Sequence, residues 1–300
     1  MRRRTFLAIG VGAAVATACA AGPNANQPGT PTNPSGKIVA ANTILADWLR
    51  QLVGDRLPVV SLLAPGVDPH IYEPTPQDAA VLETAAMIFY NGFNLEPQIE
   101  KLVRSSGRPA MAIAETVTPI QESDTPDPHV WGSVPLVIAA LPPVVARLQT
   151  QFPEGREVWA ANGDRYQQAL QALDRDLRQR LVAIPVANRK LLTTHDAFQY
   201  FGREYGIEIV PPPIGISTEE QPSPQTLRNI VQQLRQTRVP AVFVETTISP
   251  RLIETIAAEA GVKVAATPLY SDSLGAPGSG AETYADMMRH NVNALVKYLV

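Results

Sequence analysis

Two of the four histidines in this 300-residue chain occur in the same local sequence. His70 and His129 each follow Asp-Pro and precede a β-branched residue and then an aromatic residue. Proline restricts its own backbone and that of the residue before it, so each histidine is presented from a stiffened loop. Stiff presentation suits a metal ligand because binding then costs less ordering entropy. One such histidine alone is more often a hydrogen-bonded loop residue, but the repetition favours a pair of metal ligands.

A third histidine and an aspartate follow apolar segments that read as strands in the second half of the chain. His195 comes directly after Leu191-Leu192-Thr193-Thr194, and Asp272 comes after the last predicted strand. Ligands of open α/β sheets bind just beyond the carboxyl ends of the strands. We therefore expect His70, His129, His195 and Asp272 to meet in a cleft between two halves. The fourth histidine, His290, falls inside a predicted helix and is interpreted as a surface or packing residue.

The elements that must position these residues alternate between short apolar strands and amphipathic helices. Predicted strands cover 38–41, 58–63, 87–90 and 111–113, and then 190–194, 208–210, 239–245 and 262–266. Predicted helices cover 43–52, 75–84 and 94–105, and then 196–205, 223–237, 250–260 and 282–298. This order predicts an α/β fold with two halves, each with a parallel sheet between helices.

A longer helix is predicted between the two halves. Residues 156–183 contain no proline and one glycine. Their large apolar side chains form one stripe at helical spacing: Trp159, Tyr166, Leu170, Leu173, Leu177 and Leu181. A helix of this length extends ~40 Å, enough to cross both halves. We therefore expect an N-terminal lobe at 37–150, a linking helix at 151–185 and a C-terminal lobe at 186–300, with limited closure on a ligand.

The N-terminus carries features of an export signal. Three arginines at 2–4 precede an apolar stretch at 6–21, which is typical of a signal peptide. The arginines and the residues after them also partly match a twin-arginine signal, so either export route stays open. The only cysteine, Cys19, ends Ala-Thr-Ala-Cys, which resembles a bacterial lipobox with alanine in the place of the usual leucine. Lipidation at Cys19 is favoured over ordinary cleavage before it.

The segment at 20–36 is rich in proline, glycine and asparagine and has no large apolar side chain. Such a segment stays extended because it cannot bury apolar surface. We therefore expect a signal peptide at 1–19, a flexible tether at 20–36, and an exported body in the periplasm or on the outer face of the cytoplasmic membrane. A lipid at Cys19 would anchor this body to the membrane.

Composition excludes several classes of protein. Hydrophobic residues make up 45% and charged residues 18% of the chain, which supports a packed core and excludes global disorder. The net charge of −3 becomes −6 without residues 1–35, which carry three arginines and no acid. Such an acidic body argues against binding of nucleic acid. A single cysteine excludes an intrachain disulfide and a multi-cysteine metal site.

Seven motifs, in order along the body, carry a resemblance to a known family. They are GVDPHIYEPTPQD, FYNGFNLE, PDPHVW, TTHDAFQYF, GISTEEQPS, VFVETT and YSDSLG. Together they resemble the metal-binding lipoproteins of bacterial ABC importers for zinc and manganese, from about residue 37 to residue 300. The resemblance implies two (β/α) lobes with four-stranded, mainly parallel sheets, bridged by one long rigid helix. It also implies metal ligation by His70, His129, His195 and Asp272, and a monomer that works with an ABC permease and its ATPase.

This ligand set of three imidazoles and one carboxylate favours Zn²⁺ as the transported ion, because zinc accepts imidazole readily and manganese prefers oxygen donors. Members of the family that prefer manganese usually carry a carboxylate where this chain has His195. Many zinc members, however, carry a histidine-rich loop before the second ligand, and residues 117–128 contain no histidine. Mn²⁺ therefore stays open as the alternative. Candidates to orient the imidazoles are Asp68, Asp127, Asp196 and Glu245.

Two other classes of function compete with metal import. A zinc hydrolase needs a coordination position for water, and four protein ligands would close the site. The sequence also contains neither His-Glu-x-x-His nor Gly-x-Ser-x-Gly, so we do not expect an enzyme. A surface adhesin with a merely stabilising metal is the second alternative.

Overall fold

The computed structural model describes residues 36–122, 125–237 and 239–300, which belong to one compact unit. The signal peptide at 1–19, Cys19 and nearly all of the tether at 20–36 lie outside these residues. Within the described ranges, no helix is both long enough and apolar enough to cross a bilayer.

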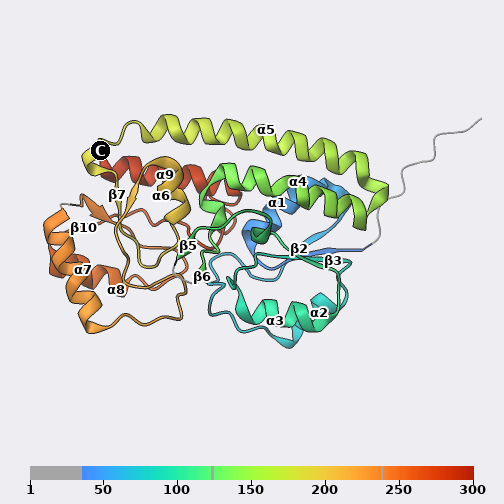
Figure 1. The fold of residues 1–300 in the computed structure, drawn as a ribbon, viewed down its shortest axis with the longest axis horizontal. Helices are drawn as coiled ribbons and strands as arrows, with labels where there is room; N and C mark the ends of the chain where they lie inside the picture. Colours follow the sequence, from blue (N-terminus) through green and yellow to red (C-terminus); the bar gives the residue numbers. More distant parts are fainter. Residues whose placement is uncertain (1–35, 123–124, 238) are drawn as a thin grey trace, which may run out of the picture. The chain divides into compact units, whose positions relative to one another are not determined.

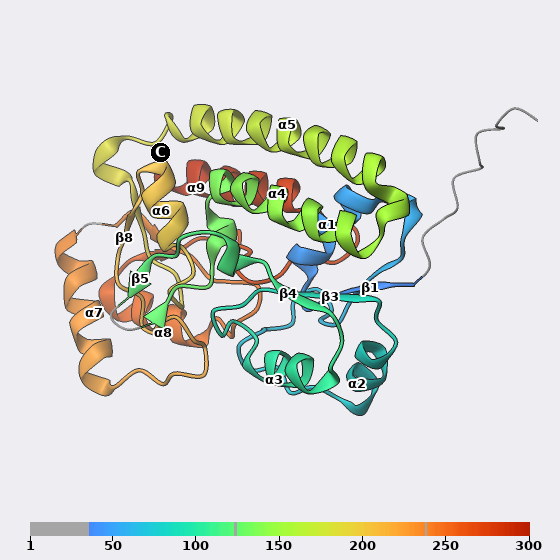
Figure 2. The same cartoon turned by 45° about the vertical axis from the view of Figure 1, so that its right-hand side comes forward.

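The N-terminal lobe is built on a four-stranded parallel sheet in the order β2-β1-β3-β4. Its strands are β1 (Ile38–Ala40), β2 (Val59–Ser61), β3 (Met87–Tyr90) and β4 (Ala110–Ala112). Its helices are α1 (Thr43–Val53), α2 (Pro76–Glu83) and α3 (Pro97–Ser106). Alternate residues of the central strands face opposite sides. Ala40 and Phe89 join the core that contains α1, whereas Val39 and Ile88 pack with α2 and α3 below the sheet (Figure 2).

The C-terminal lobe repeats this strand order with shorter strands. They are β7 (Lys190–Leu191), β8 (Glu208–Ile209), β9 (Ala241–Val242) and β10 (Lys263–Val264). Two parallel pairs, β7–β8 and β9–β10, are joined where Phe243 N donates to Leu192 O at 3.0 Å. The resulting order β8-β7-β9-β10 matches that of the first lobe. The helices are α6 (Gln199–Tyr205), α7 (Pro224–Thr237), α8 (Arg251–Ala260) and α9 (Tyr284–Leu299).

The strands of this lobe are shorter than the sequence predicts. Beyond β7, the backbone amides of Thr194 and His195 donate to the Glu245 carboxylate and not to a neighbouring strand. A side chain therefore replaces the backbone ladder at the end of the sheet where His195 lies.

One long helix joins the lobes. The linking helix α5 (Arg156–Leu181) has 26 residues and extends ~39 Å. All six residues of the predicted stripe are buried. Along its length α5 packs against α1 and α4 (Val134–Gln151) at one end and α9 at the other (Figure 1). The sequence did not predict α4, because Pro142 and Pro143 lie inside it.

One hydrophobic core runs through both lobes. It contains Leu45 of α1, Leu141 of α4, Leu173 of α5 and Leu295 of α9, together with Phe243 beside β9. Because the lobes share this core, rotation of one against the other would expose apolar surface.

A short antiparallel pair, β5 (Gln121–Glu122) and β6 (Thr125–Pro126), precedes the loop that carries His129.

Candidate metal centre

The four predicted ligand residues lie in four loops at one end of the two sheets. His70 lies between β2 and α2, and His129 precedes the 3₁₀ turn Val130–Gly132. His195 lies between β7 and α6, and Asp272 lies between β10 and α9. All four are at most 3% exposed. One nitrogen or oxygen atom from each lies within 4.8 Å of those from the others, so the structure brings together the complete predicted set.

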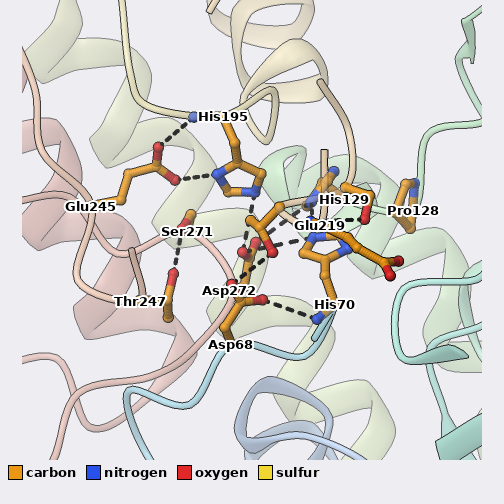
Figure 3. A network of polar contacts seen from close by, with 12 residues as sticks. Asp68, His70, Pro128, His129, His195, Glu219, Glu245, Thr247, Ser271 and Asp272 are labelled. Atoms are coloured by element: carbon orange, nitrogen blue, oxygen red, sulfur yellow. Dashed lines mark hydrogen bonds and ion pairs between the residues drawn. The ribbon is translucent and has the colours of Figure 1, made fainter. Parts of the chain in front are cut away.

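The ligand atoms point toward one position (Figure 3). His70 Nε2 lies 3.3 Å from His129 Nε2 and 3.9 Å from Asp272 Oδ2. The Asp272 carboxylate lies 3.5 Å from His129 Nε2 and 3.1 Å from His195 Nε2. Four ligands at the ~2.0 Å of a typical zinc–nitrogen bond lie ~3.3 Å apart in a tetrahedron. The separations between these atoms therefore suit a four-coordinate transition-metal ion.

A carboxylate fixes the ring of His129. Asp127 Oδ1 lies 2.7 Å from His129 Nδ1 and also accepts from the His129 backbone amide at 2.9 Å. Tyr200 in turn donates its hydroxyl to the Asp127 carbonyl at 2.7 Å. Trp131 packs on the imidazole in a T-shaped arrangement, with ring centroids 5.2 Å apart. With Nδ1 donating to Asp127, Nε2 keeps its lone pair for a metal.

Glu245, which follows β9, holds the ring of His195 in the same way. Its Oε2 atom lies 2.6 Å from His195 Nδ1, and its Oε1 atom accepts from the amides of Thr194 and His195 at 2.7 and 2.9 Å. Burial alone lowers the pKa of His195, but the carboxylates of Glu245 and Asp272 outweigh it and raise the pKa well above the usual value. Burial likewise opposes ionisation of Asp272, yet His195 and the other imidazoles hold the pKa of Asp272 below its usual range.

His70 is held through its backbone. Asp68 Oδ1 accepts from the His70 amide at 3.0 Å, while Asp68 Oδ2 accepts from the Thr218 hydroxyl at 2.7 Å. Thr218 belongs to the C-terminal lobe, so this carboxylate bridges the two lobes beside the site. Burial lowers the pKa of His70 to about 3, which leaves its imidazole neutral and able to bind a metal at neutral pH.

Comparison with known proteins identifies the family of this chain. Residues 38–298 match the model of the ZnuA family, described as the periplasmic component A of a zinc-uptake complex. The chain belongs to this family. It is 35% identical over 287 residues to the manganese-binding lipoprotein MntA of Halalkalibacterium halodurans, covering 93% of this chain and 94% of that protein. It is also 29% identical to PsaA of Streptococcus pneumoniae, named a manganese ABC transporter substrate-binding lipoprotein, over 98% of each chain.

A solved structure shares the two-lobed fold. The periplasmic zinc-binding protein TroA from Treponema pallidum superposes with a TM-score of 0.85 at 29% identity, covering 88% of this chain and 99% of that one. The predicted fold class and the predicted family are therefore confirmed.

In this member of the ZnuA family, the loop that carries Asp272 is anchored to the N-terminal lobe. Trp131 Nε1 donates to the Ser271 carbonyl at 2.8 Å, and Leu274 N donates to Thr43 Oγ1 at 2.9 Å. These partners come from the other half of the sequence. No local pattern marks Thr43 or Trp131 for this role, and sequence reasoning missed both.

The four acids proposed to orient the imidazoles have different partners. Asp127 and Glu245 contact imidazole rings, whereas Asp68 contacts only the backbone of its histidine. The Asp196 carboxylate accepts from the Gln199 side chain and not from a metal-ligand residue.

His290 lies away from the site. Its Nε2 atom lies 3.0 Å from the Pro268 carbonyl, and its ring packs on Tyr270, which fits the predicted packing role.

Proposed function

We propose that this protein is the extracytoplasmic metal-binding component of an ABC importer. It captures Zn²⁺ or Mn²⁺ with His70, His129, His195 and Asp272 and delivers the ion to a membrane permease. The observation that carries the proposal is the convergence of four buried ligand atoms from both lobes. The similarity to MntA, PsaA and TroA supports it, since each of these proteins is named as a binding protein for one of these metals.

Zinc is the preferred cargo in this proposal. Three nitrogen donors and one oxygen donor favour zinc over manganese, and the separations of 3.1–3.9 Å involving Asp272 suit a small tetrahedral ion. Manganese is the second candidate, because relatives that cover nearly the whole chain are named as manganese-binding proteins. With both Asp272 oxygens bound, the same residues would offer a manganese ion five donors.

The ligand set suits capture and release better than catalysis. Four protein ligands complete a tetrahedral shell, whereas a hydrolytic zinc site keeps a position for water. The proposal therefore assigns no enzymatic reaction to the site. The partners it implies are a permease with its ATPase, and the protein acts as a monomer held to the membrane by a lipid on Cys19. This anchor is supported by the lipoprotein names of its relatives.

Metal analysis of the purified protein tests the proposal. Metal-stripped protein is titrated with zinc and with manganese against a competing chelator, and bound metal is counted by elemental analysis. We expect one ion per chain and tighter binding of zinc. His290→Gln, which removes a histidine outside the site, is the matched control and keeps full binding. A wild-type protein that binds neither metal stoichiometrically would refute the assignment.

A further inference from the structure

The segment between β3 and α3 has an unusual backbone. Gly92, Phe93 and Asn94 have φ angles of 89°, 53° and 59°, and Phe93 and Asn94 are the non-glycine residues with positive φ in the described chain. A Cβ atom at Gly92 would lie 2.9 Å from both Ala112 Cβ and Glu115 Oε1, so only glycine fits there. Positive φ at residues other than glycine is costly and persists where the surroundings enforce it, often beside functional sites.

This turn directs the Glu96 side chain into the protein. Glu96 occupies the N-cap position of α3, yet its side chain makes no capping hydrogen bond to that helix. The residue is fully buried, and its Oε1 atom accepts from Asn91 N and from Asn42 Nδ2, each at 3.2 Å. None of the ion pairs found among the described residues includes Glu96. Burial raises its pKa to about 8, so the carboxyl is largely neutral at pH 7.

Each of the two asparagines leads to a loop that carries a metal ligand. Asn91 Nδ2 donates at 3.0 Å to the carbonyl of Pro128, the residue directly before His129. Asn42 Oδ1 accepts from Leu45 N at 3.0 Å and so caps α1. The first residue of α1 is Thr43, which holds the Asp272 loop through Leu274 N.

We propose that Glu96 is a positioning residue of the metal centre. Through Asn91 it fixes the loop that carries His129. Through Asn42 it fixes the start of α1, and Thr43 at that start holds the loop that carries Asp272. This inference rests on the proposed metal-binding function. A carboxyl buried without an ion pair costs stability, and an apolar side chain could fill its place at lower cost. Its hydrogen bonds to both asparagines account for the presence of a buried acceptor oxygen there.

Substitutions at Glu96 test this role. Glu96→Ala removes the shared acceptor, and we expect zinc and manganese to bind at least about tenfold more weakly, as when groups that orient metal ligands are lost. Glu96→Gln keeps an acceptor oxygen of the same reach and should bind within about threefold of wild type. Glu100→Ala is the matched control: this acid lies one turn later on α3 and pairs with Arg104, not with Asn42 or Asn91.

Two readouts separate positioning from general stability. Affinity is measured by chelator competition, and the melting temperature is measured on metal-free protein. A Glu96→Ala protein with wild-type affinity, whatever its melting temperature, would overturn the inference, and so would equal losses from Glu96→Gln and Glu96→Ala. Absence of metal binding by the wild type would instead refute the proposed function.

A second variant keeps the test decisive if Glu96→Ala does not fold. Asn91→Ala leaves Glu96 and the backbone amide of residue 91 in place but removes the bond to Pro128. We expect it to lose affinity for both metals at least about tenfold. A folded Asn91→Ala protein with wild-type affinity would contradict the route from Glu96 to His129.

Discussion

Glutamine in place of Glu245 would separate two effects of this carboxylate on His195. The substitution keeps the length of the side chain, and its amide oxygen can still accept from the amides of Thr194 and His195. It removes the negative charge that lies 2.6 Å from His195 Nδ1.

The two effects act in opposite directions on metal affinity. Because Glu245 and Asp272 raise the pKa of His195, an incoming metal must displace a proton at neutral pH. Each pH unit below that raised pKa weakens binding about tenfold, or ~1.4 kcal/mol. Loss of Glu245 lowers the pKa of His195 and relieves this competition. It also removes the group that orients the ring, which costs about 10- to 100-fold in intrinsic affinity.

The expected result is a change in the pH dependence of affinity. For the wild type, the logarithm of the zinc association constant should rise with pH around neutrality, by up to about one per pH unit, since one histidine proton is displaced. For Glu245→Gln the rise should be clearly smaller, so the deficit of the variant should grow with pH. Chelator competition at half-unit intervals from pH 6.5 to 8 measures both curves.

A neighbouring acid provides the control for this experiment. Asp196 follows His195 in sequence but contacts Gln199, so Asp196→Asn should keep the wild-type slope. Equal slopes for wild type and Glu245→Gln would refute the reasoning, because His195 would then not carry the displaced proton.

Four further outcomes are expected. Asp272→Asn should weaken zinc binding more than about 100-fold in calorimetric titration, because a neutral amide replaces the one anionic ligand; retained affinity would exclude Asp272 as a ligand. The pKa of about 3 for His70 means that the unfolded chain gains a proton below pH 6.5 that the folded chain does not. Metal-free wild type should therefore lose ~2 kcal/mol between pH 6.5 and 5 relative to His70→Gln in urea unfolding, and parallel curves would contradict this. Leu173→Ala should lower the free energy of unfolding by ~2–5 kcal/mol because it leaves a cavity in the core. The number of metal ions bound per chain should not change, and a changed number would contradict a purely structural role of Leu173. Thr218→Val should remove a hydrogen bond worth ~0.5–1.5 kcal/mol between the lobes and speed metal release about two- to tenfold in stopped-flow chelation, whereas unchanged release would assign the bond no role in closure.

Local patterns were enough to predict most of the secondary structure. The apolar runs and helical stripes gave the order of strands and helices in both lobes, and β3 was predicted at its observed bounds. The prediction failed at α4, where two prolines argue against a helix, yet Leu141 and Val144 are buried in the shared core on either side of them. Tertiary packing there outweighs the unfavourable helix propensity of proline.

The sequence by itself determined the candidate ligands, because Asp-Pro-His and the ends of predicted strands are features of adjacent residues. Only the tertiary structure decided how those ligands are held. It selected Asp127 and Glu245 over Asp68 and Asp196 as partners of the imidazole rings, and it attached the Asp272 loop to the other lobe through Trp131. Such contacts join residues that lie far apart along the chain. Their choice depends on how the two lobes pack around α5, which no short stretch of sequence encodes.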